Sequence, residues 1–361
     1  MTPRFHLLTI SEVRRETAEA ISVRFAVPPA LRDAYRFEQG QFVTLNSAVG
    51  GEELRRSYSV CSAVSEYERS GELRVGIKKI DGGRFSSFAC DNFKAGMTLQ
   101  VMTPDGRFFT PVDAAHRKHY VAFAGGSGIT PVLSIVKTVL QVEVASRFTL
   151  IYGNRAVASI MFAEELEELK NRYIGRLSLH HVISDEAQEV DLLGGLLDFA
   201  RCARFLDTLV PPATIDEAFI CGPGPMMDAA EAALLAAGVA REQIHVERFG
   251  TPLPAAGPRK AVMDNSAPSA EVHVIQHGKT RVLRVPFDGA ALLDAGLAAG
   301  LDLPYACKGG VCCTCRARVL VGEVQMDRNY TLEAREIAAG FVLTCQSHPR
   351  APKVVVSYDE R

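Results

Sequence analysis

The N-terminal part of the chain alternates between hydrophobic and polar positions in short runs. These runs occupy residues 20–27, 41–49, 55–63, 72–80 and 97–106, and glycine or proline interrupts the chain between them. Alternation with a period of two over such lengths predicts half-buried strands. Several short strands separated by turns are typical of an antiparallel barrel. We therefore expect residues 1–112 to form an antiparallel β-barrel.

From residue 113 the pattern changes to apolar runs that alternate between strand and helix character. Strands are predicted at residues 119–125, 147–155, 177–184 and 217–225. Helices are predicted among them at residues 130–141, 161–173 and 226–239. Alternating strands and helices are typical of βαβ units around a parallel sheet. Residues 113–249 are therefore expected to form an α/β domain.

Residues 250–269 lack periodicity and are rich in proline, glycine and alanine, which predicts a linker. A flexible linker of about 20 residues has a root-mean-square reach of about 25 Å. Residues 270–361 form the third predicted unit. It begins with a hairpin around His277 and Gly278, continues with a helix and a cysteine-rich loop, and ends with two further strands.

Composition and charge exclude several classes of protein. Hydrophobic residues make up 47% of the 361 positions and the formal net charge is −2, so no basic surface for nucleic acid is indicated. The chain begins without the apolar core of a secretory signal, and no apolar run is long enough for a membrane helix. Nine cysteines, an odd number with four of them scattered, do not suggest a disulfide framework. We expect a cytoplasmic protein in a reducing compartment.

The sequence CKGGVCCTC at residues 307–315 concentrates four thiols and could serve as a disulfide staple, a redox pair, a zinc site or an iron–sulfur site. Cys307, Cys312 and Cys315 follow the spacing C-x4-C-x2-C, and Cys345 lies farther along the chain. This is the ligand spacing of a plant-type [2Fe–2S] cluster. A zinc ribbon would more often show two C-x2-C pairs, so zinc is the less favoured alternative. Cys313 is the surplus thiol and is expected to be a packed small residue.

Two glycines in that loop fit the cluster interpretation. The loop must wrap closely around bridging sulfides and direct backbone N–H groups at them. A Cβ atom at Gly309 or Gly310 would obstruct this wrapping.

Glycine turns before helices predict phosphate sites at two further places. Gly82 and Gly83 precede an expected helix, whose N-terminus could bind a diphosphate with help from the Ser86 hydroxyl. A simple capped helix is the alternative. The sequence AGGSGITP at residues 124–131 ends a strand and opens a helix, as a dinucleotide phosphate loop does. The sequence CGPGPMM at residues 221–227 ends a later strand, so both loops should lie at the carboxyl edge of one sheet.

The order of these motifs resembles the ferredoxin–NADP reductase superfamily over essentially the whole chain. R-x-Y-S, G-G-x-x-S, G-G-S-G-I-T-P and C-G-P occur in turn before the plant-type ferredoxin pattern. Other segments are similar to the reductase subunits of phenylacetyl-CoA epoxidases, namely YRFEQGQ, GEELRRSYS, LIYGNR, HVERF, LPYACKGGVC and VVVSYDE. The resemblance implies a multidomain protein: a flavin-binding antiparallel β-barrel, an α/β parallel-sheet nucleotide domain, and an α+β domain of the β-grasp type.

The resemblance also implies residue roles around the flavin. Arg56 would pair with the diphosphate of FAD, Tyr58 would stack on the isoalloxazine, and Ser59 would lie near its reactive N5 atom. The diphosphate would be cradled by Gly83, Arg84 and Ser86. Phe249 would cover the flavin ring, although a core phenylalanine is the alternative.

For the nicotinamide nucleotide, the resemblance implies a second set of residues. Cys221 would lie beside C4 of the nicotinamide, with Glu247 as a nearby acid, although a buried small residue is the alternative for Cys221. The nucleotide itself would be held by Gly126, Ser127, Gly128 and Thr130.

Arg155 bears on the choice of nucleotide. It follows a strand at the point where an acidic residue would bind a free ribose 2′-hydroxyl, and an arginine there suits a 2′-phosphate. Ser159 could assist. NADPH is therefore favoured over NADH, with an ordinary surface arginine as the alternative.

The function implied by the resemblance is electron transfer from NADPH through FAD and a [2Fe–2S] cluster to a multisubunit di-iron oxygenase, such as the epoxidase that acts on phenylacetyl-CoA. A reductase for an aromatic-ring dioxygenase or for another multicomponent monooxygenase is an alternative. A further alternative is a non-catalytic iron–sulfur redox sensor or electron carrier. No pattern in the sequence supports a sensor that acts on DNA.

Overall fold

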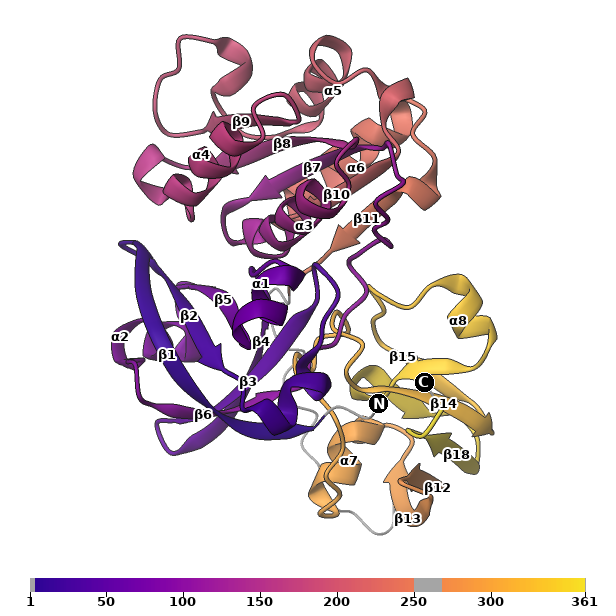
Figure 1. The fold of residues 1–361 in the computed structure, drawn as a ribbon. Helices are drawn as coiled ribbons and strands as arrows, with labels where there is room; N and C mark the ends of the chain where they lie inside the picture. The colour runs from indigo at the N-terminus through magenta and orange to yellow at the C-terminus, as the bar shows by residue number, and fades with distance from the viewer. Residues whose placement is uncertain (1–3, 250–267, 361) are drawn as a thin grey trace. The chain divides into compact units, whose positions relative to one another are not determined.

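A computed structural model describes residues 4–249 and 268–360, which fall into two compact units. Residues 5–249 form the N-terminal unit, and Arg4 with residues 268–360 forms the C-terminal unit. Figure 1 shows the chain coloured from its N-terminus to its C-terminus. The predicted linker at residues 250–269 lies outside the described residues up to residue 267, and a strand already begins at Ser269.

The first part of the N-terminal unit is a curled antiparallel sheet of six strands in the order β4-β3-β6-β1-β2-β5. An isolated bridge between Val60 and Val75 joins the regions of its two edge strands and brings the sheet close to a barrel. Apolar side chains from all these strands fill the interior, including Leu8, Val23 and Val101. The strands are β1 (Phe5–Thr17), β2 (Ala20–Ala26), β3 (Phe42–Val49), β4 (Glu52–Ser59), β5 (Glu72–Lys78) and β6 (Thr98–Met102).

Two short helices belong to this barrel. Helix α1 (Val64–Ser70) follows the strand β4 and is capped by Gly71, which adopts a positive φ of 70°. Helix α2 (Arg84–Asn92) follows β5 through the turn at Gly82, which also has a positive φ of 70°. A 3-10 helix, Pro29–Tyr35, connects β2 to β3.

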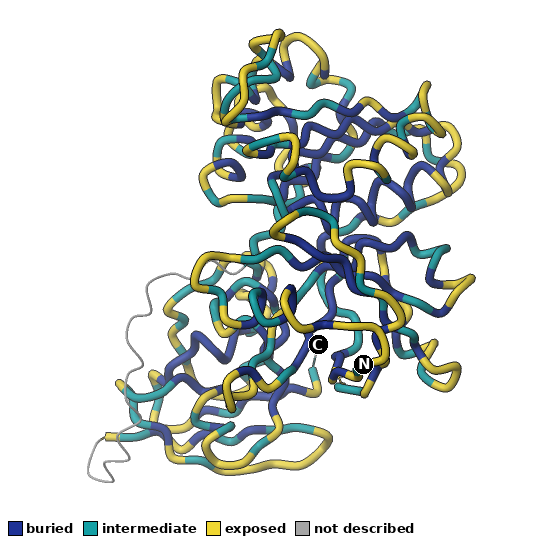
Figure 2. Tube along the Cα trace, turned by 90° about the vertical axis from the view of Figure 1, so that its left-hand side faces the viewer, coloured by how far each residue is buried: buried dark blue, intermediate teal, exposed yellow. Residues whose placement is uncertain are grey.

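The second part of the N-terminal unit is a five-stranded parallel sheet in the order β11-β10-β7-β8-β9. The strands are β7 (His119–Gly125), β8 (Arg147–Asn154), β9 (Leu177–Ile183), β10 (Glu217–Cys221) and β11 (Ile244–Glu247). Each residue of β7, the central strand, is buried. Figure 2 shows how buried and exposed segments alternate along the chain. The predicted α/β arrangement is therefore correct.

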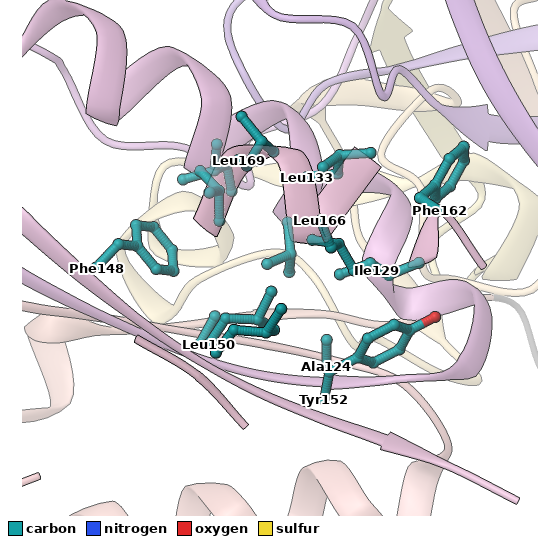
Figure 3. Packing of buried hydrophobic residues seen from close by; sticks show 14 of the residues in the cluster. Ala124, Ile129, Leu133, Phe148, Leu150, Tyr152, Phe162, Leu166 and Leu169 are labelled. Carbon is teal, nitrogen blue, oxygen red and sulfur yellow. The ribbon is translucent and has the colours of Figure 1, made fainter. Parts of the chain in front are cut away.

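Helices cover both faces of the parallel sheet (Figure 1). Helices α3 (Ile129–Val142) and α4 (Ala163–Arg172) pack on one face, where Leu133, Leu166 and Phe148 meet (Figure 3). Helices α5 (Phe199–Thr208) and α6 (Gly224–Ala236) pack on the other. Short 3-10 helices lie at Gly126–Gly128, Val157–Ser159, Asp191–Leu193, Pro212–Thr214 and Arg241–Gln243.

The C-terminal unit is a mixed five-stranded sheet in the order β13-β12-β18-β14-β16. Strands β12 and β18 are parallel and the other neighbours are antiparallel, which agrees with the expected β-grasp type. The predicted hairpin turns at His277 and Gly278, both with positive φ, as a two-residue hairpin turn requires. The sheet contains β12 (Ser269–Gln276), β13 (Lys279–Pro286), β14 (Arg316–Val321), β16 (Phe341–Leu343) and β18 (Lys353–Ser357).

The remaining elements of the C-terminal unit surround the cysteine-rich loop. Strands β15 (Val324–Met326) and β17 (Ser347–Pro349) form a separate two-stranded sheet. Helix α7 (Leu292–Ala298) precedes the loop, helix α8 (Ala334–Ala338) follows it, and a 3-10 helix spans Thr344–Gln346.

Over residues 4–249 and 268–360, no helix combines the length and the hydropathy needed to cross a bilayer.

Candidate functional site

The edge strand β4 carries the R-x-Y-S motif at its C-terminal end. Tyr58 is partly buried, and its ring lies 5.8 Å from that of Phe85 at the start of α2. Ser59 is buried, and Arg56 is exposed with its guanidinium on the carbonyl of Arg55 at 2.7 Å. Burial raises the pKa of the Tyr58 hydroxyl, so it stays protonated. The contact between Tyr58 and Phe85 brings the motif and the predicted diphosphate turn together.

The turn before α2 is held by the Ser86 hydroxyl. The hydroxyl accepts a hydrogen bond from the backbone N–H of Ile80 at 3.2 Å, and a Cβ at Gly83 would lie only 2.5 Å from it. Ser86 therefore supports the turn whose backbone would face the diphosphate. Arg84 is exposed and pairs with Glu52 at 2.7 Å. The helix N-terminus itself keeps the backbone N–H groups that can bind an anion.

The two predicted loops of the parallel sheet converge at its carboxyl edge. A Cβ at Gly128 would lie 2.0 Å from the carbonyl oxygen of Cys221, so only glycine allows this approach. Gly126 has a positive φ of 52°, and its carbonyl accepts a hydrogen bond from the Tyr152 hydroxyl at 2.9 Å. The buried Thr130 hydroxyl donates to the carbonyl of Ser127 at 3.0 Å. These bonds form a compact glycine cradle at the start of α3.

Cys221 and Glu247 occupy paired positions on neighbouring parallel strands. Cys221 is fully buried, and this burial raises the pKa of its thiol well above the usual value. Burial, with a smaller effect from Asp105, raises the pKa of Glu247 to about 8. The carboxyl group is therefore largely protonated at neutral pH and can donate a hydrogen bond. Phe249 packs against the apolar cluster that contains Cys221.

Arg155 lies just beyond β8, and its side chain is 65% exposed. Its guanidinium pairs with Glu19 of the barrel at 3.2 Å. The hydroxyl of Ser159 is bonded to the backbone of Ala156, so its expected contribution to phosphate binding would require that bond to break.

Lys78 is a residue near the nucleotide loop that the sequence motifs do not identify. It ends β5, and a Cβ at Gly126 would lie 3.7 Å from its ammonium nitrogen. Burial lowers the pKa of Lys78, Glu19 counteracts this shift, and Arg155 adds to it. In the sequence, Lys78 could be recognised only as a lysine that ends an apolar strand shortly before a glycine turn. Such a lysine has no fixed spacing from the nucleotide loop, so the motifs do not identify it.

The cysteine-rich loop collects four sulfur atoms in two contacting pairs. The thiols of Cys307 and Cys312 lie close enough to shift each other's pKa, and so do the thiols of Cys315 and Cys345. Within each pair the neighbouring thiol lowers one pKa and raises the other. The pKa of Cys307 falls to about 6 and that of Cys345 is lowered, while those of Cys312 and Cys315 are raised. A [2Fe–2S] cluster requires two thiolates on each of its two irons. The four cysteines can supply them, so this donor set fits such a cluster.

Backbone groups around the loop also suit such a cluster. The N–H of Gly309 donates to the sulfur of Cys307 at 3.3 Å. Gly310 has a positive φ of 80°, and a Cβ there would lie 3.2 Å from the carbonyl of Arg328. A Cβ at Gly309 would meet nothing closer than 3.8 Å, so within the protein only Gly310 has a steric requirement. Among the described residues, no three or more His, Cys, Asp or Glu side chains gather around one ion position.

Cys313 differs from its four neighbours. Its backbone has a positive φ of 55°, and its sulfur lies 3.2 Å from the hydroxyl of Thr331. The surplus thiol thus has a partner outside the two sulfur pairs.

Three family models match the chain in succession. The oxidoreductase FAD-binding domain matches residues 7–110, the oxidoreductase NAD-binding domain matches residues 123–232, and the 2Fe-2S iron-sulfur cluster binding domain matches residues 274–350. These matches agree with the cofactor classes expected from the motifs.

Relatives of known function align with almost the whole chain. The chain is 46% identical to a subunit of the 1,2-phenylacetyl-CoA epoxidase of Escherichia coli, over 99% of this chain and 98% of the relative. It is 36% identical to the ferredoxin reductase component of 3-ketosteroid-9-alpha-monooxygenase of Rhodococcus rhodochrous, over 95% and 94%. It is 31% identical to the glycine betaine monooxygenase reductase subunit of Pseudomonas aeruginosa, over 98% and 95%.

Solved structures share the fold. Phthalate dioxygenase reductase superposes with a TM-score of 0.58 at 22% identity and covers 98% of both chains. An intact type IV self-sufficient cytochrome P450 monooxygenase superposes with a TM-score of 0.70 at 21% identity, over 98% of this chain and 41% of that one. The chain therefore belongs to the ferredoxin–NADP reductase superfamily, in the group of oxidoreductases that join an FAD-binding, an NAD-binding and a C-terminal [2Fe–2S] domain.

Proposed function

We propose that this protein passes electrons from NADPH through FAD and a [2Fe–2S] cluster to a multisubunit di-iron oxygenase. The observation that supports this most directly is the 46% identity to the relative from the phenylacetyl-CoA epoxidase, which extends over nearly the full length of both chains. An epoxidase of that kind, acting in phenylacetate degradation, is the proposed electron acceptor.

The flavin supplies the conversion between two-electron and one-electron transfer, because a nicotinamide delivers hydride whereas a [2Fe–2S] cluster accepts single electrons. The chain's own residues bind and orient the cofactors. The flavin-binding part is proposed at residues 1–112, the nucleotide-binding part at 113–249 and the cluster-binding part at 270–361. The proposed flavin residues are Arg56, Tyr58, Ser59, Gly83, Arg84, Ser86 and Phe249.

The carboxyl edge of the parallel sheet is the proposed nucleotide site. The cradle of Gly126, Ser127, Gly128 and Thr130 would bind phosphate, and the nearby Lys78 would add a positive charge. Cys221 and Glu247 carry neutral groups at neutral pH, because burial raises both of their pKa values. Together with Ser59 they would surround the atoms between which hydride passes without adding charge there. We assign the cluster to Cys307, Cys312, Cys315 and Cys345.

A cytoplasmic location is part of the proposal. All nine cysteines lie within the described residues, and each is free of a disulfide. A protein with this many free thiols is typical of a reducing compartment such as the cytoplasm.

Arg155 should discriminate between the two nucleotides. Replacing it with alanine should raise the Michaelis constant for NADPH by about ten- to a hundredfold, because a charge-assisted bond to the 2′-phosphate is lost. The constant for NADH should change little. Glu19→Gln is the matched control, since it frees the Arg155 guanidinium from its partner and should improve the binding of NADPH. Equal effects of Arg155→Ala on both nucleotides would show that the arginine does not bind the phosphate.

A second candidate is a reductase for a different oxygenase. The relatives with 36% and 31% identity are named as components of a ketosteroid monooxygenase and a glycine betaine monooxygenase, so similarity alone does not select the acceptor. Reconstitution decides the matter. The purified protein should support oxygen-dependent turnover of phenylacetyl-CoA by a phenylacetyl-CoA epoxidase and should fail with the other two oxygenases. The reverse result would favour the second candidate.

A further inference from the structure

A set of buried polar contacts, called the polar seam below, joins the segment after the flavin motif, residues 61–64, to helix α3, which follows the nucleotide loop. The Ser134 hydroxyl of α3 donates to the carbonyl of Ser62 at 2.7 Å. The Thr138 hydroxyl, one turn further, accepts from the N–H of Val64 at 3.3 Å. Both α3 side chains are buried. Since Ser62 lies three residues beyond Ser59, the seam begins next to the flavin motif.

Lys137 lies at the centre of this seam. It is only 5% exposed, and its ammonium group contacts three acceptors. These are the carbonyl of Cys61 at 3.3 Å, Oε2 of Glu66 at 2.7 Å and Oε1 of Glu165 at 2.8 Å. A buried ammonium is stable only when such partners replace its hydration. Lys137 thereby connects α3 to the barrel and to α4.

Glu165 extends the seam to β5. Its Oε2 accepts a charge-assisted hydrogen bond from Arg74, whose side chain is 9% exposed. The backbone N–H of Arg74 donates to the Ser62 hydroxyl at 2.7 Å, and its carbonyl accepts from the N–H of Cys61 at 2.8 Å. The segment of Cys61 and Ser62 is therefore hydrogen-bonded both to β5 and to α3. The two oxygens of the Glu165 carboxylate bridge Arg74 of the barrel and Lys137 of helix α3.

The strand β5 and the helix α3 are closely packed beside the polar seam. A Cβ at Gly76 on β5 would lie 2.6 Å from the methyl group of Thr130, in the first turn of α3. The strand and the nucleotide helix thus touch closely where the seam ends. The Arg74 guanidinium also lies 5.1 Å from the centre of the Phe162 ring, which packs in the core beside α3 (Figure 3). Packed contacts of this kind hold two elements in one arrangement.

We propose that Lys137 and Glu165 are positioning residues for hydride transfer, because they fix the loop after the flavin motif against the helix that begins at the nucleotide loop. The proposal rests on the cofactor positions proposed above. Hydride transfer requires the two reacting atoms within near-attack distance, and a displacement of about 1 Å can cost about a hundredfold in rate. Loss of the Glu165 carboxylate would deprive the buried Arg74 guanidinium of this partner and remove one of the three acceptors of Lys137, so the two elements would shift apart.

The neighbouring Glu164 provides a matched control. Like Glu165 it lies on α4 and pairs with an arginine of the barrel, Arg14, at 2.6 Å. Its side chain, however, is 83% exposed, and Arg14 is 52% exposed. Exposed pairs of this kind contribute little to the free energy of folding. The two substitutions Glu165→Gln and Glu164→Gln therefore separate the buried seam from a surface ion pair on the same helix.

The test uses the full-length, FAD-loaded protein in rapid mixing with NADPH. Glu165→Gln should lower the rate constant of flavin reduction at saturating NADPH by about tenfold or more, and Glu164→Gln should change it by less than about twofold. A second readout needs no turnover: titration with NADP⁺ perturbs the oxidised flavin spectrum. The amplitude of that perturbation should fall in Glu165→Gln while the FAD content is retained.

A purely structural role would give a different pattern. If Glu165→Gln lowered the melting temperature but left both the rate constant and the NADP⁺ difference spectrum as in the wild type, the proposal would be overturned. Should Glu165→Gln not accumulate as a folded flavoprotein, Lys137→Met keeps the Glu165–Arg74 pair and is judged by the same two readouts, with Lys137→Arg as the variant expected to restore them. Failure of wild-type protein to be reduced by NADPH would instead contradict the proposed function.

Discussion

Replacing Cys312 with serine should abolish the visible absorption and the reduced-state EPR signal of the [2Fe–2S] cluster, whereas Cys313→Ser should retain both. Cys312 is buried and its thiol contacts that of Cys307. The adjacent thiol of Cys313 instead lies against Thr331. A cluster needs two thiolates on each iron, and the alcohol of serine is a poor substitute for a soft ligand.

The two variants are matched because the same atom is exchanged at neighbouring positions. Cys312→Ser should also lose all oxygenase turnover while it still reduces ferricyanide with NADPH. Loss of the EPR signal in Cys313→Ser together with its survival in Cys312→Ser would reverse the assignment of the ligands.

A protein that ends at residue 251 should keep its flavin and its NADPH–ferricyanide activity but lose oxygenase support by several orders of magnitude. Residues 5–249 form one compact unit with their own apolar cores, so they should fold without the rest of the chain. The proposed exit for single electrons lies in the part that is removed. Flavin content, ferricyanide reduction and oxygenase-coupled turnover are the three measurements.

The full-length Cys312→Ser variant is the control for this truncation, since it removes the cluster and leaves the C-terminal sequence in place. Both proteins should behave alike. Oxygenase turnover at the full-length rate by the truncated protein would show that the cluster is not the exit.

Most of the parallel sheet follows from the sequence, because four of its strands are largely apolar runs bounded by glycine, proline or polar residues. Strand β7 coincides with the predicted range, residues 119–125. Strand β11 was missed because, of its four residues, Ile244 alone is buried, so it lacks an apolar run. Helix α5 was missed for a similar reason, since its apolar face consists of little more than Cys202, Phe205 and Leu206.

In the barrel, the sequence pattern does not predict strand β1. Its second half contains Glu12, Arg14, Arg15 and Glu16, which disturb the alternation of hydrophobic and polar positions. Pairing with β2 nevertheless holds this segment in a strand, while β6 pairs with the first half of β1. Here tertiary context outweighs the local pattern.

The residues of the candidate site also differ in whether a local sequence pattern predicts them. Glycine turns and cysteine spacings are local patterns that constrain the backbone directly, so Gly128 and Cys312 could be identified from neighbouring residues alone. Lys78 and the pair of Lys137 with Glu165 depend on segments that are far apart in the chain. Charged residues brought together in this way have no characteristic spacing, which is why the sequence did not indicate them.

The central claim is that electrons pass from NADPH to the flavin, then to the cluster, and from there to the oxygenase. Anaerobic rapid mixing of the oxidised full-length protein with NADPH, followed at separate flavin and cluster wavelengths, tests this order directly. The account predicts that flavin absorbance falls first and that cluster absorbance falls only afterwards. Cluster reduction that precedes flavin reduction, or that proceeds in protein stripped of FAD, would contradict it.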